Sequence, residues 1–212
     1  MNNKINNIEV FTNIYKNKVW GDSGDAFLLG SSGQGSSVEA TDEYYNPFIR
    51  RFIEENNIKT VVDLGCGDWQ SSYHIYNNTD VEYYGYDAYE NIVITMNKRY
   101  SMKQNYTFCF LDVVNDLDKV IDGDLYIIKD VLQHLNYDSI YTLLDNIKKT
   151  KKTKFILITN DTSSDNHLDI PNGGYRPINW DGLHLGCYAT ERMMRYTQKN
   201  DPRIKEIVLI RV

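Results

Sequence analysis

Short β-branched runs alternate with amphipathic segments along most of this chain, and that alternation constrains the fold more than any other feature of the sequence. We expect strands over residues 60–64, 81–86, 107–111, 125–128 and 155–159. The remaining patterns predict helices over residues 42–56, 90–100, 130–135 and 137–149. Strands joined by helices favour a parallel sheet that is covered by helices on both faces. The sequence therefore predicts an α/β fold, a Rossmann-like three-layer sandwich.

The sheet should hold seven strands, mostly parallel, and residues 205–212 should form an antiparallel strand within it. A chain of 212 residues has room for one domain with a core large enough for such a sheet. We expect residues 60–212 to carry the sheet. Residues 1–59, which include a Gly/Ser-rich run at 30–37, should form a helical cap of the same domain. Residues 160–186 hold prolines and glycines among polar residues, which is typical of an irregular segment.

An acidic residue stands at or close to the carboxyl end of each of the first five expected strands. These residues are Asp63, Asp87, Asp112, Asp130 and Asp161. In parallel sheets, ligands bind beyond the carboxyl ends of the strands, near the point where the strand order reverses. Aspartate is also common in turns and at helix N-caps, so a structural role is the alternative for each residue. The pattern predicts a binding site at this edge of the sheet.

The segment 61–69 places two glycines directly after the first strand. Gly65 and Gly67 remove side chains where the backbone must turn sharply and pass close to a ligand. Asp63, on the strand before them, can accept a hydrogen bond or pair with a cationic amino group. Asp87 lies 20 residues after Gly67, at the end of the next strand, where an acid can hold both hydroxyls of a ribose. An ordinary tight turn is the alternative for a lone Gly-x-Gly.

This strand, followed by acid-x-Gly-x-Gly, resembles the nucleotide-binding signature of the class I S-adenosylmethionine-dependent methyltransferases. Further motifs extend the likeness over most of the chain and resemble a poorly characterised group of small bacterial and viral methyltransferases. These motifs are Phe11–Tyr15, Trp20-Gly21, the run at 30–37, Cys66–Asp68, Asp130–Leu135 and Tyr175–Pro177. The resemblance implies that residues 60–212 form a methyltransferase domain, with S-adenosylmethionine as its cofactor.

The resemblance also implies which residues hold this cofactor. They are Asp63, Gly65, Cys66, Gly67, Asp87, Asp112, Val113, Lys129, Ser36 and Ser37. Asp63 and the two glycines should line the methionine, and Asp87 should hold the ribose. Asp112 and Val113 should edge the adenine. Residues 34–37 should close over the cofactor from the N-terminal side, and a surface connection without such a role is the alternative.

Methyl transfer to a hydroxyl group needs a base that removes the proton. His134 is the leading candidate because it follows Asp130 by four residues, so that a helix would place both side chains on one face. Asp130 could then orient the imidazole or contact the acceptor. A structural hydrogen bond is the alternative role for His134. His167 and His184 are weaker candidates for the base.

Three residues of the later part of the chain are expected to contact the methyl acceptor: Arg176, Tyr175 and Asp161. The guanidinium of Arg176 can bind a carboxylate or phosphate through its fork of donors, and a buried ion pair is its alternative role. Mg²⁺ held by Asp130 together with Asn160 or Asp161 would lower the pKa of the acceptor hydroxyl. The sequence offers no further ligand, so Mg²⁺ stays an alternative and no metal ligand is assigned.

Other uses of this architecture fit the sequence less well. Dinucleotide dehydrogenases carry a third glycine where this chain has Gln70. Residues 129–132 lack the Pro-Pro-aromatic tetrad of enzymes that methylate amino groups of DNA bases. No proline precedes a cysteine, as methylation of cytosine C5 would need. The formal net charge of −6 supplies no basic face, so we expect no nucleic-acid partner.

The expected acceptor is a small molecule or a sugar or glycan precursor, and the expected reaction is O-methylation of a hydroxyl. A protein side chain or amino group is one alternative acceptor, and a cofactor-binding subunit without catalysis is another class of function. The chain has no apolar run of about 18 residues, so we expect no membrane partner. Three widely spaced cysteines predict neither a disulfide framework nor a zinc site and favour a reducing, cytoplasmic setting. The sequence does not indicate an oligomeric state.

Overall fold

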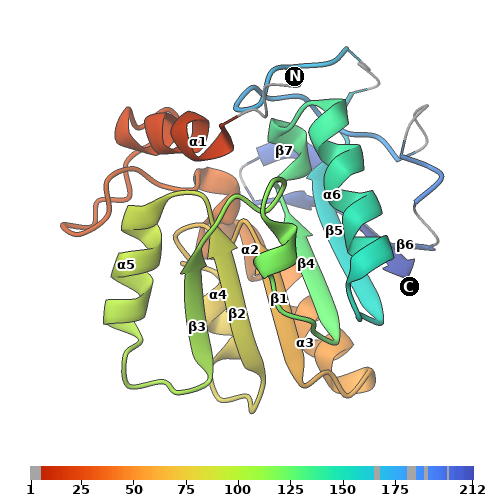
Figure 1. Cartoon of the computed structure of the whole chain (residues 1–212), viewed down its shortest axis with the longest axis horizontal. Helices are drawn as coiled ribbons and strands as arrows, with labels where there is room; N and C mark the ends of the chain where they lie inside the picture. The colour runs from red at the N-terminus through yellow and green to blue at the C-terminus, as the bar shows by residue number, and fades with distance from the viewer. Residues whose placement is uncertain (1–5, 165–167, 181–184, 189–190, 200) are drawn as a thin grey trace.

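The computed structural model describes residues 6–164, 168–180, 185–188, 191–199 and 201–212. They form a seven-stranded sheet of order β3-β2-β1-β4-β5-β7-β6 (Figure 1). The strands are β1 (Thr60–Leu64), β2 (Glu82–Asp87), β3 (Tyr106–Phe110), β4 (Leu125–Lys129), β5 (Phe155–Asp161), β6 (Glu191–Gln198) and β7 (Asp201–Arg211). Strands β1 to β5 are parallel, and β7 runs antiparallel to both of its neighbours, β5 and β6. The predicted sheet, with its antiparallel C-terminal strand, is confirmed.

Helices cover both faces of this sheet. They are α1 (Asn7–Lys16), α2 (Val38–Thr41), α3 (Tyr45–Glu55), α4 (Ser72–Tyr76), α5 (Glu90–Arg99) and α6 (Tyr137–Thr150). Three short 3₁₀ turns are η1 (Gln34–Ser36), η2 (Leu117–Lys119) and η3 (Leu132–His134). The apolar sides of α3, α4 and α5 pack on one face of the sheet, and that of α6 packs on the other (Figure 1). The three predicted layers are therefore present.

Two apolar cores result because successive residues of a strand point to opposite faces. Val61 of β1 belongs to the same core as Ile49 of α3 and Ile92 of α5. Its neighbour Val62 belongs to the other core, together with Leu143 of α6. All five side chains are buried. Strands that are buried on both faces are apolar along their whole length, which is why their sequences could be recognised.

The helix predicted for residues 130–135 is wrong. Asp130 has a φ of 57°, in the left-handed region, and its amide donates to the carbonyl oxygen of Thr159 on β5 at 2.8 Å. Asp130 thus extends the pairing of β4 with β5 by one hydrogen bond, and its φ is incompatible with an α-helix. Only the turn η3 follows. A left-handed conformation costs a non-glycine residue about 1 kcal/mol or more, and such strain concentrates at functional sites.

The helix predicted for residues 42–56 begins later, as α3, and α2 precedes it. Pro47 lies in the first turn of α3, where a residue without an N–H group is tolerated. The side chain of Asn46 donates to Asp42 Oδ1 at 2.7 Å and to Thr41 Oγ1 at 3.2 Å. These two hydrogen bonds join α2 to α3 across the break. The other predicted helices correspond closely to α5 and α6.

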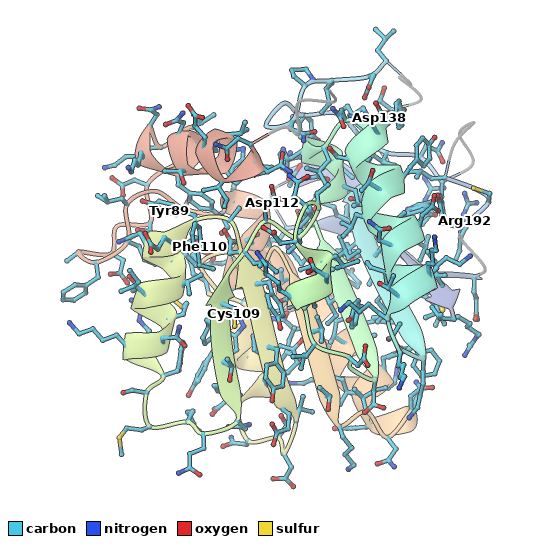
Figure 2. The ribbon with its side chains drawn as sticks, viewed as in Figure 1. Tyr89, Cys109, Phe110, Asp112, Asp138 and Arg192 are labelled. Carbon is cyan, nitrogen blue, oxygen red and sulfur yellow. The ribbon has the colours of Figure 1, made fainter. Side chains whose placement is uncertain are left out.

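Helix α1 lies across the edge of the sheet at which the parallel strands end (Figure 1). Figure 2 shows Asp112 and Tyr89 at this same edge, near α1. No disulfide involves Cys66, Cys109 or Cys187 in the part of the chain that the structure describes. Among the described residues, no helix combines the length and the apolar character that crossing a membrane requires.

Candidate active site

A cavity of about 370 Å³ opens at the edge of the sheet where the parallel strands end. It lies over the neighbouring tips of β1 and β4, the point at which the strand order reverses. Small-molecule sites typically measure roughly 300–1,000 Å³. The wall is made by α1, the Gly/Ser loop (residues 30–37), the tips of β1 to β4, η3 and β7. The position is the one that the strand-end acids predicted.

Two glycines shape the turn after β1. Gly65 and Gly67 have φ values of 85° and 59°, in the region that favours glycine. A Cβ atom on Gly65 would lie 2.4 Å from Val131 Cγ2, and one on Gly67 would lie 2.3 Å from Ser32 Oγ. Both positions therefore require glycine for space as well as for conformation. Cys66, between them, is buried and lines the cavity.

Asp63 and Asp87 are buried acids that line the cavity at the tips of β1 and β2. The hydroxyl of Tyr83 donates to Asp63 Oδ2 at 2.7 Å. The amides of Gly67 and Tyr89 donate to the two carboxylate oxygens of Asp87 at 3.0 and 2.9 Å. Burial raises the pKa of each acid to about 6, because a buried carboxylate loses its hydration. The site therefore holds two anions that a cationic ligand would stabilise.

Asp112 joins the end of β3 to α1. Its Oδ1 accepts hydrogen bonds from Asn7 Nδ2 at 3.1 Å and from the Val114 amide at 3.0 Å. Asn7 is itself held by Asn172, whose Nδ2 lies 2.6 Å from Asn7 Oδ1. Asp112 and Val113 both line the cavity, as predicted for the end of β3. This buried polar chain fixes α1 over the strand tips, which the sequence did not indicate.

The Gly/Ser loop lies against the glycine turn. The Ser32 amide donates to Asp68 Oδ2 at 3.0 Å, and the Asp68 amide donates to Ser32 Oγ at 2.8 Å. Ser36 lines the cavity as predicted. Ser37 does not reach the cavity, because its side chain caps α2 by accepting a hydrogen bond from the Ala40 amide at 3.3 Å. The structure thus brings together nine of the ten predicted cofactor residues.

Asp130 lies between two lysines at the far end of the cavity. Lys129 Nζ is 2.8 Å from its Oδ2, and Lys205 Nζ of β7 is 2.6 Å from its Oδ1. Burial alone would raise the pKa of Asp130, but the two ammonium groups outweigh this and hold its pKa well below the usual range. Lys205 is 2% exposed, so the pair is shielded from solvent and its attraction is little screened.

This environment does not fit the Mg²⁺ alternative. Both carboxylate oxygens of Asp130 are occupied by ammonium groups, whose charge repels a cation. The hydroxyl of Tyr175 donates to Asp161 Oδ2, and the Ser163 amide donates to Asp161 Oδ1 at 2.7 Å. Neither Asn160 nor Asp161 lines the cavity. In the part of the chain that the structure describes, no three His, Cys, Asp or Glu residues are grouped to hold a metal ion.

His134 lines the cavity beside Asp130 and packs against Trp20, with 4.7 Å between the ring centroids. Its Nδ1 lies 2.8 Å from the carbonyl oxygen of Gly174. A carbonyl only accepts, so Nδ1 carries the proton and Nε2 is left with a lone pair in the neutral ring. Burial lowers the pKa of His134, which keeps the ring neutral near pH 7. The Gly174 carbonyl, rather than Asp130, orients the imidazole.

The two other histidine candidates, His167 and His184, lie outside the described residues. Tyr175 lines the cavity, with its ring centroid 5.8 Å from that of His134. Arg176 does not line it. Its Nη1 donates to the carbonyl oxygen of Leu135 at 2.8 Å, and its guanidinium lies over the ring of Tyr137 at 4.2 Å. Its Nη1 also lies 3.8 Å from Asp169 Oδ1, so the structure gives Arg176 an ion pair, which was the alternative to its contact with the acceptor. Asp161 lies behind Tyr175.

Several cavity residues were missed from the sequence: Asn7, Tyr15, Trp20, Gln133, Arg203 and Lys205. Lys205 offered a signal, because it is a lysine at the start of a strand expected within the sheet, two residues before the apolar run 207–210. A charged residue is rarely buried unless it is paired or functional. Tyr15 and Trp20 belong to motifs that carried the resemblance, but no role in the site was assigned to them, since aromatic rings are usually packing residues.

No protein-family model matches this chain, and no curated protein matches its sequence significantly. Solved structures match its fold. The N-methyltransferase NodS from Bradyrhizobium japonicum, in complex with S-adenosylhomocysteine, has a TM-score of 0.65 and 10% identity, with 98% of each chain covered. The N-terminal domain of EvdMO1 with S-adenosylhomocysteine bound has a TM-score of 0.59 and 14% identity, covering 79% of this chain and 80% of that one.

The methyltransferase domain of bacterial CtHen1 is a third similar structure, with a TM-score of 0.61 and 11% identity. The match covers 81% of this chain and 99% of that one. At such low identities the likeness concerns the fold. This chain has the Rossmann-like fold of the S-adenosylmethionine-dependent methyltransferases.

Proposed function

We propose that this chain is an S-adenosylmethionine-dependent methyltransferase that O-methylates a hydroxyl of a small molecule or of a sugar or glycan precursor. The observation that carries the proposal is the cavity over β1 and β4, where the glycine turn is hydrogen-bonded to the acid of the next strand. A sulfonium nucleoside needs such a cradle, because it presents a ribose diol and two cationic groups to the protein. The fold shared with methyltransferases agrees with this assignment.

Residues at the tips of β1 to β3 would hold the cofactor. Asp63 would pair with the amino group of its methionine part, beside Gly65 and Gly67. The carboxylate oxygens of Asp87 each keep a lone pair beyond their amide contacts, and these would accept the two ribose hydroxyls. Val113 would pack on the adenine. When bound, S-adenosylmethionine supplies an electrophilic methyl group on a positively charged sulfur.

His134 would act as the base at the acceptor side of the cavity. The acceptor oxygen would take the methyl group that bound S-adenosylmethionine supplies, and the electron pair of the broken carbon–sulfur bond would stay on the sulfur. The hydroxyl proton passes to His134 Nε2, which the Gly174 carbonyl leaves free to accept it. Trp20 and Tyr175 would exclude water around this transfer and hold the acceptor in line.

A sugar acceptor is favoured by one comparison, since the N-terminal domain of EvdMO1 was crystallised in the presence of S-adenosylhomocysteine and D-fucose. An amino-group acceptor is the second candidate, because NodS is an N-methyltransferase of the same fold. His134 favours the hydroxyl, which must lose a proton as it reacts. We also infer that the partner is a small molecule rather than nucleic acid, because the net charge is −6. A cytoplasmic location stays a prediction.

Calorimetric titration tests the proposal most directly. S-adenosylmethionine and S-adenosylhomocysteine should each bind with saturable heat, and NAD should bind much more weakly, because this chain lacks the third glycine of the dinucleotide fingerprint. The absence of heat with both nucleosides would overturn the proposal. Binding without methylation of any hydroxyl or amine in a broad acceptor panel would instead indicate a non-catalytic cofactor-binding subunit.

A further inference from the structure

The charged residues that line the cavity are unevenly distributed, because most of its acids lie on β1 to β3 and all of its cations lie on β4 and β7. Its acids at the cofactor end, beyond the tips of β1 to β3, are Asp63, Asp68, Asp87 and Asp112. Its cations lie on β4 and β7 and are Lys129, Arg203 and Lys205, and the acid Asp130 lies between Lys129 and Lys205. A sulfonium nucleoside accounts for the acidic end. The cationic end faces the space that the proposed cofactor leaves for the acceptor.

Lys205 is the most buried of these cations, with 2% of its side chain exposed. Its Nζ donates to Asp130 Oδ1 at 2.6 Å. An ammonium group has three N–H donors, so this contact leaves donors for a further partner. A buried lysine is costly to keep charged unless it is fully satisfied, and the cavity is where a ligand could satisfy it.

Arg203 stands two residues before Lys205, at the irregular start of β7, and both residues line the cavity. Its Nε lies 2.9 Å from both oxygens of Asp201, and its Nη1 lies 3.5 Å from the hydroxyl of Tyr175. Its Nε is also 3.9 Å from Asp161 Oδ2. Its Nη2 also donates to Asp201 Oδ2 at 2.5 Å, so Asp201 pairs with Nε and Nη2, and one N–H group on each of Nη1 and Nη2 is left for a further partner.

Three acids balance these three cations. Asp130, Asp161 and Asp201 all have both carboxylate oxygens engaged by neighbouring donors. Of the three, only Asp130 lines the cavity. The wall on β4 and β7 therefore presents three cations and one acid to an incoming molecule. The groups of this wall that can still form hydrogen bonds are N–H donors of the cations. A neutral polyol could accept such hydrogen bonds, but it would carry no negative charge to pair with these cations.

We propose that the acceptor carries an anionic group, a carboxylate or a phosphate, which binds between Lys205 and Arg203. This inference rests on the proposed function, and it assigns the role once expected of Arg176 to two residues of β7. An ammonium and a guanidinium that line the same cavity match an oxyanion, because charge-assisted hydrogen bonds are roughly twice as strong as neutral ones. The anchored group holds the acceptor so that its hydroxyl faces His134.

Isothermal titration of the protein saturated with S-adenosylhomocysteine tests this assignment, with inorganic phosphate, D-glucuronate and D-glucose as matched probes. We expect at least one anion to bind saturably and to bind at least about 30-fold more tightly than glucose, as for a desolvated charge pair. Tighter phosphate binding indicates a phosphate ester as acceptor, and tighter glucuronate binding indicates a carboxylate. Glucose binding as tight as that of the anions, or no saturable anion binding, overturns the proposal.

Variants locate the site. Lys205→Met and Arg203→Met should each weaken anion binding at least about tenfold. Lys154→Met should leave it unchanged, because Lys154 is exposed and lies before β5, at the opposite edge of the sheet. If Lys205→Met does not fold, Arg203→Met decides, since its side chain is 40% exposed. Anion binding that survives both substitutions overturns the assignment.

Failure of the proposed function is distinguishable from failure of this inference. If S-adenosylhomocysteine does not bind, the proposed function fails, and the same titrations of the unliganded protein still test the anion site. If the nucleoside binds normally to Lys205→Met and Arg203→Met while anion binding is lost, both proposals are supported. If the nucleoside binds but no anion does, the function stands and the anionic acceptor is excluded.

Discussion

The backbone amide of Gly67 donates a hydrogen bond of 3.0 Å to Oδ2 of Asp87, which ties the turn after β1 to the acid at the tip of β2. The amide of Tyr89 holds the other carboxylate oxygen at 2.9 Å. The position and orientation of this acid are therefore fixed before any ligand arrives. Preorganisation of this kind reduces the entropy that binding must overcome.

Gly67→Ala should destabilise the protein and weaken cofactor binding. The new Cβ would lie 2.3 Å from Ser32 Oγ at a φ of 59°, so strain and a clash with the Gly/Ser loop combine. Gly24→Ala is the matched control, because Gly24 has a φ of 69° but nothing within 4 Å of the added carbon. Gly24→Ala should cost about 1 kcal/mol and Gly67→Ala more. Equal costs in denaturant unfolding would contradict the clash.

Asp63→Asn should weaken S-adenosylhomocysteine binding by about 10- to 100-fold, the value of one lost charge-assisted hydrogen bond. The amide oxygen can still accept from the Tyr83 hydroxyl, so the fold should tolerate the change. Asp118→Asn, at an exposed acid, is the control for the lost charge. Calorimetry and thermal melting measure both effects. An unchanged dissociation constant would exclude contact between Asp63 and the cofactor.

Cofactor affinity should depend on pH because the pKa of both Asp63 and Asp87 is raised to about 6. Below that pH the carboxyls are protonated and cannot pair with a cation. The dissociation constant should then rise by about tenfold per pH unit for each carboxyl that must ionise. Titration of S-adenosylhomocysteine between about pH 5 and pH 8 checks this dependence. A flat profile would mean that neither acid binds as a carboxylate.

The stability of the unliganded protein should show the opposite trend. A carboxyl whose folded pKa is raised stabilises the fold fully below its unfolded pKa, near 4, and this contribution is lost as pH rises through about 6. Asp63→Asn removes one of the two groups, so the loss of stability between these pH values should be smaller. Urea unfolding of both proteins across this range measures the difference.

His134→Gln should lower kcat by about 10²- to 10⁴-fold for any hydroxyl acceptor that the protein methylates. The glutamine amide can still donate to the Gly174 carbonyl but cannot take up a proton. The dissociation constant of S-adenosylhomocysteine should not change, and the acid limb of the pH–rate profile should disappear. A variant that loses stability but keeps kcat would assign His134 a structural role.

Leu209→Ala should destabilise the protein by about 2–5 kcal/mol, because Leu209 is fully buried in β7 and pairs with Leu157 of β5. Val212→Ala, at a side chain that is 49% exposed, should change stability little. Chemical denaturation of both variants compares an interior and an exposed position. Similar costs would contradict the interior position of β7.

The sequence predicted those parts of the fold and the site that depend on residues close to one another along the chain. The glycines and Asp63 lie within one turn of each other, so their chemistry could be recognised directly. The central strands are continuous apolar runs because they are buried on both faces. Strand β6 is an edge strand whose residues Glu191 and Arg195 are exposed or half-exposed, so its pattern lacks that signal.

The acceptor end of the cavity could not be predicted in the same way. Lys205 and Asp130 are 75 residues apart, and they meet because β7 inserts beside β5. No local spacing encodes that contact. The helix expected around His134 is absent for a related reason. The amide of Asp130 donates to Thr159 of the neighbouring strand β5 instead of to a helical partner. Tertiary contacts overrode local preference at the point where the site is built.

The carbonyl oxygen of Gly35 accepts hydrogen bonds from Lys129 Nζ at 3.2 Å and from Gln198 Nε2 at 3.0 Å. The Gly/Ser loop is thus hydrogen-bonded at one end to the glycine turn and at the other end to the lysine that contacts Asp130. We propose that this loop closes over the bound cofactor, so that the by-product would leave only after these hydrogen bonds break. We therefore expect release of the by-product to limit the turnover rate. The protein should then be inhibited when the by-product accumulates, so that its rate in a cell would depend on how quickly the by-product is removed.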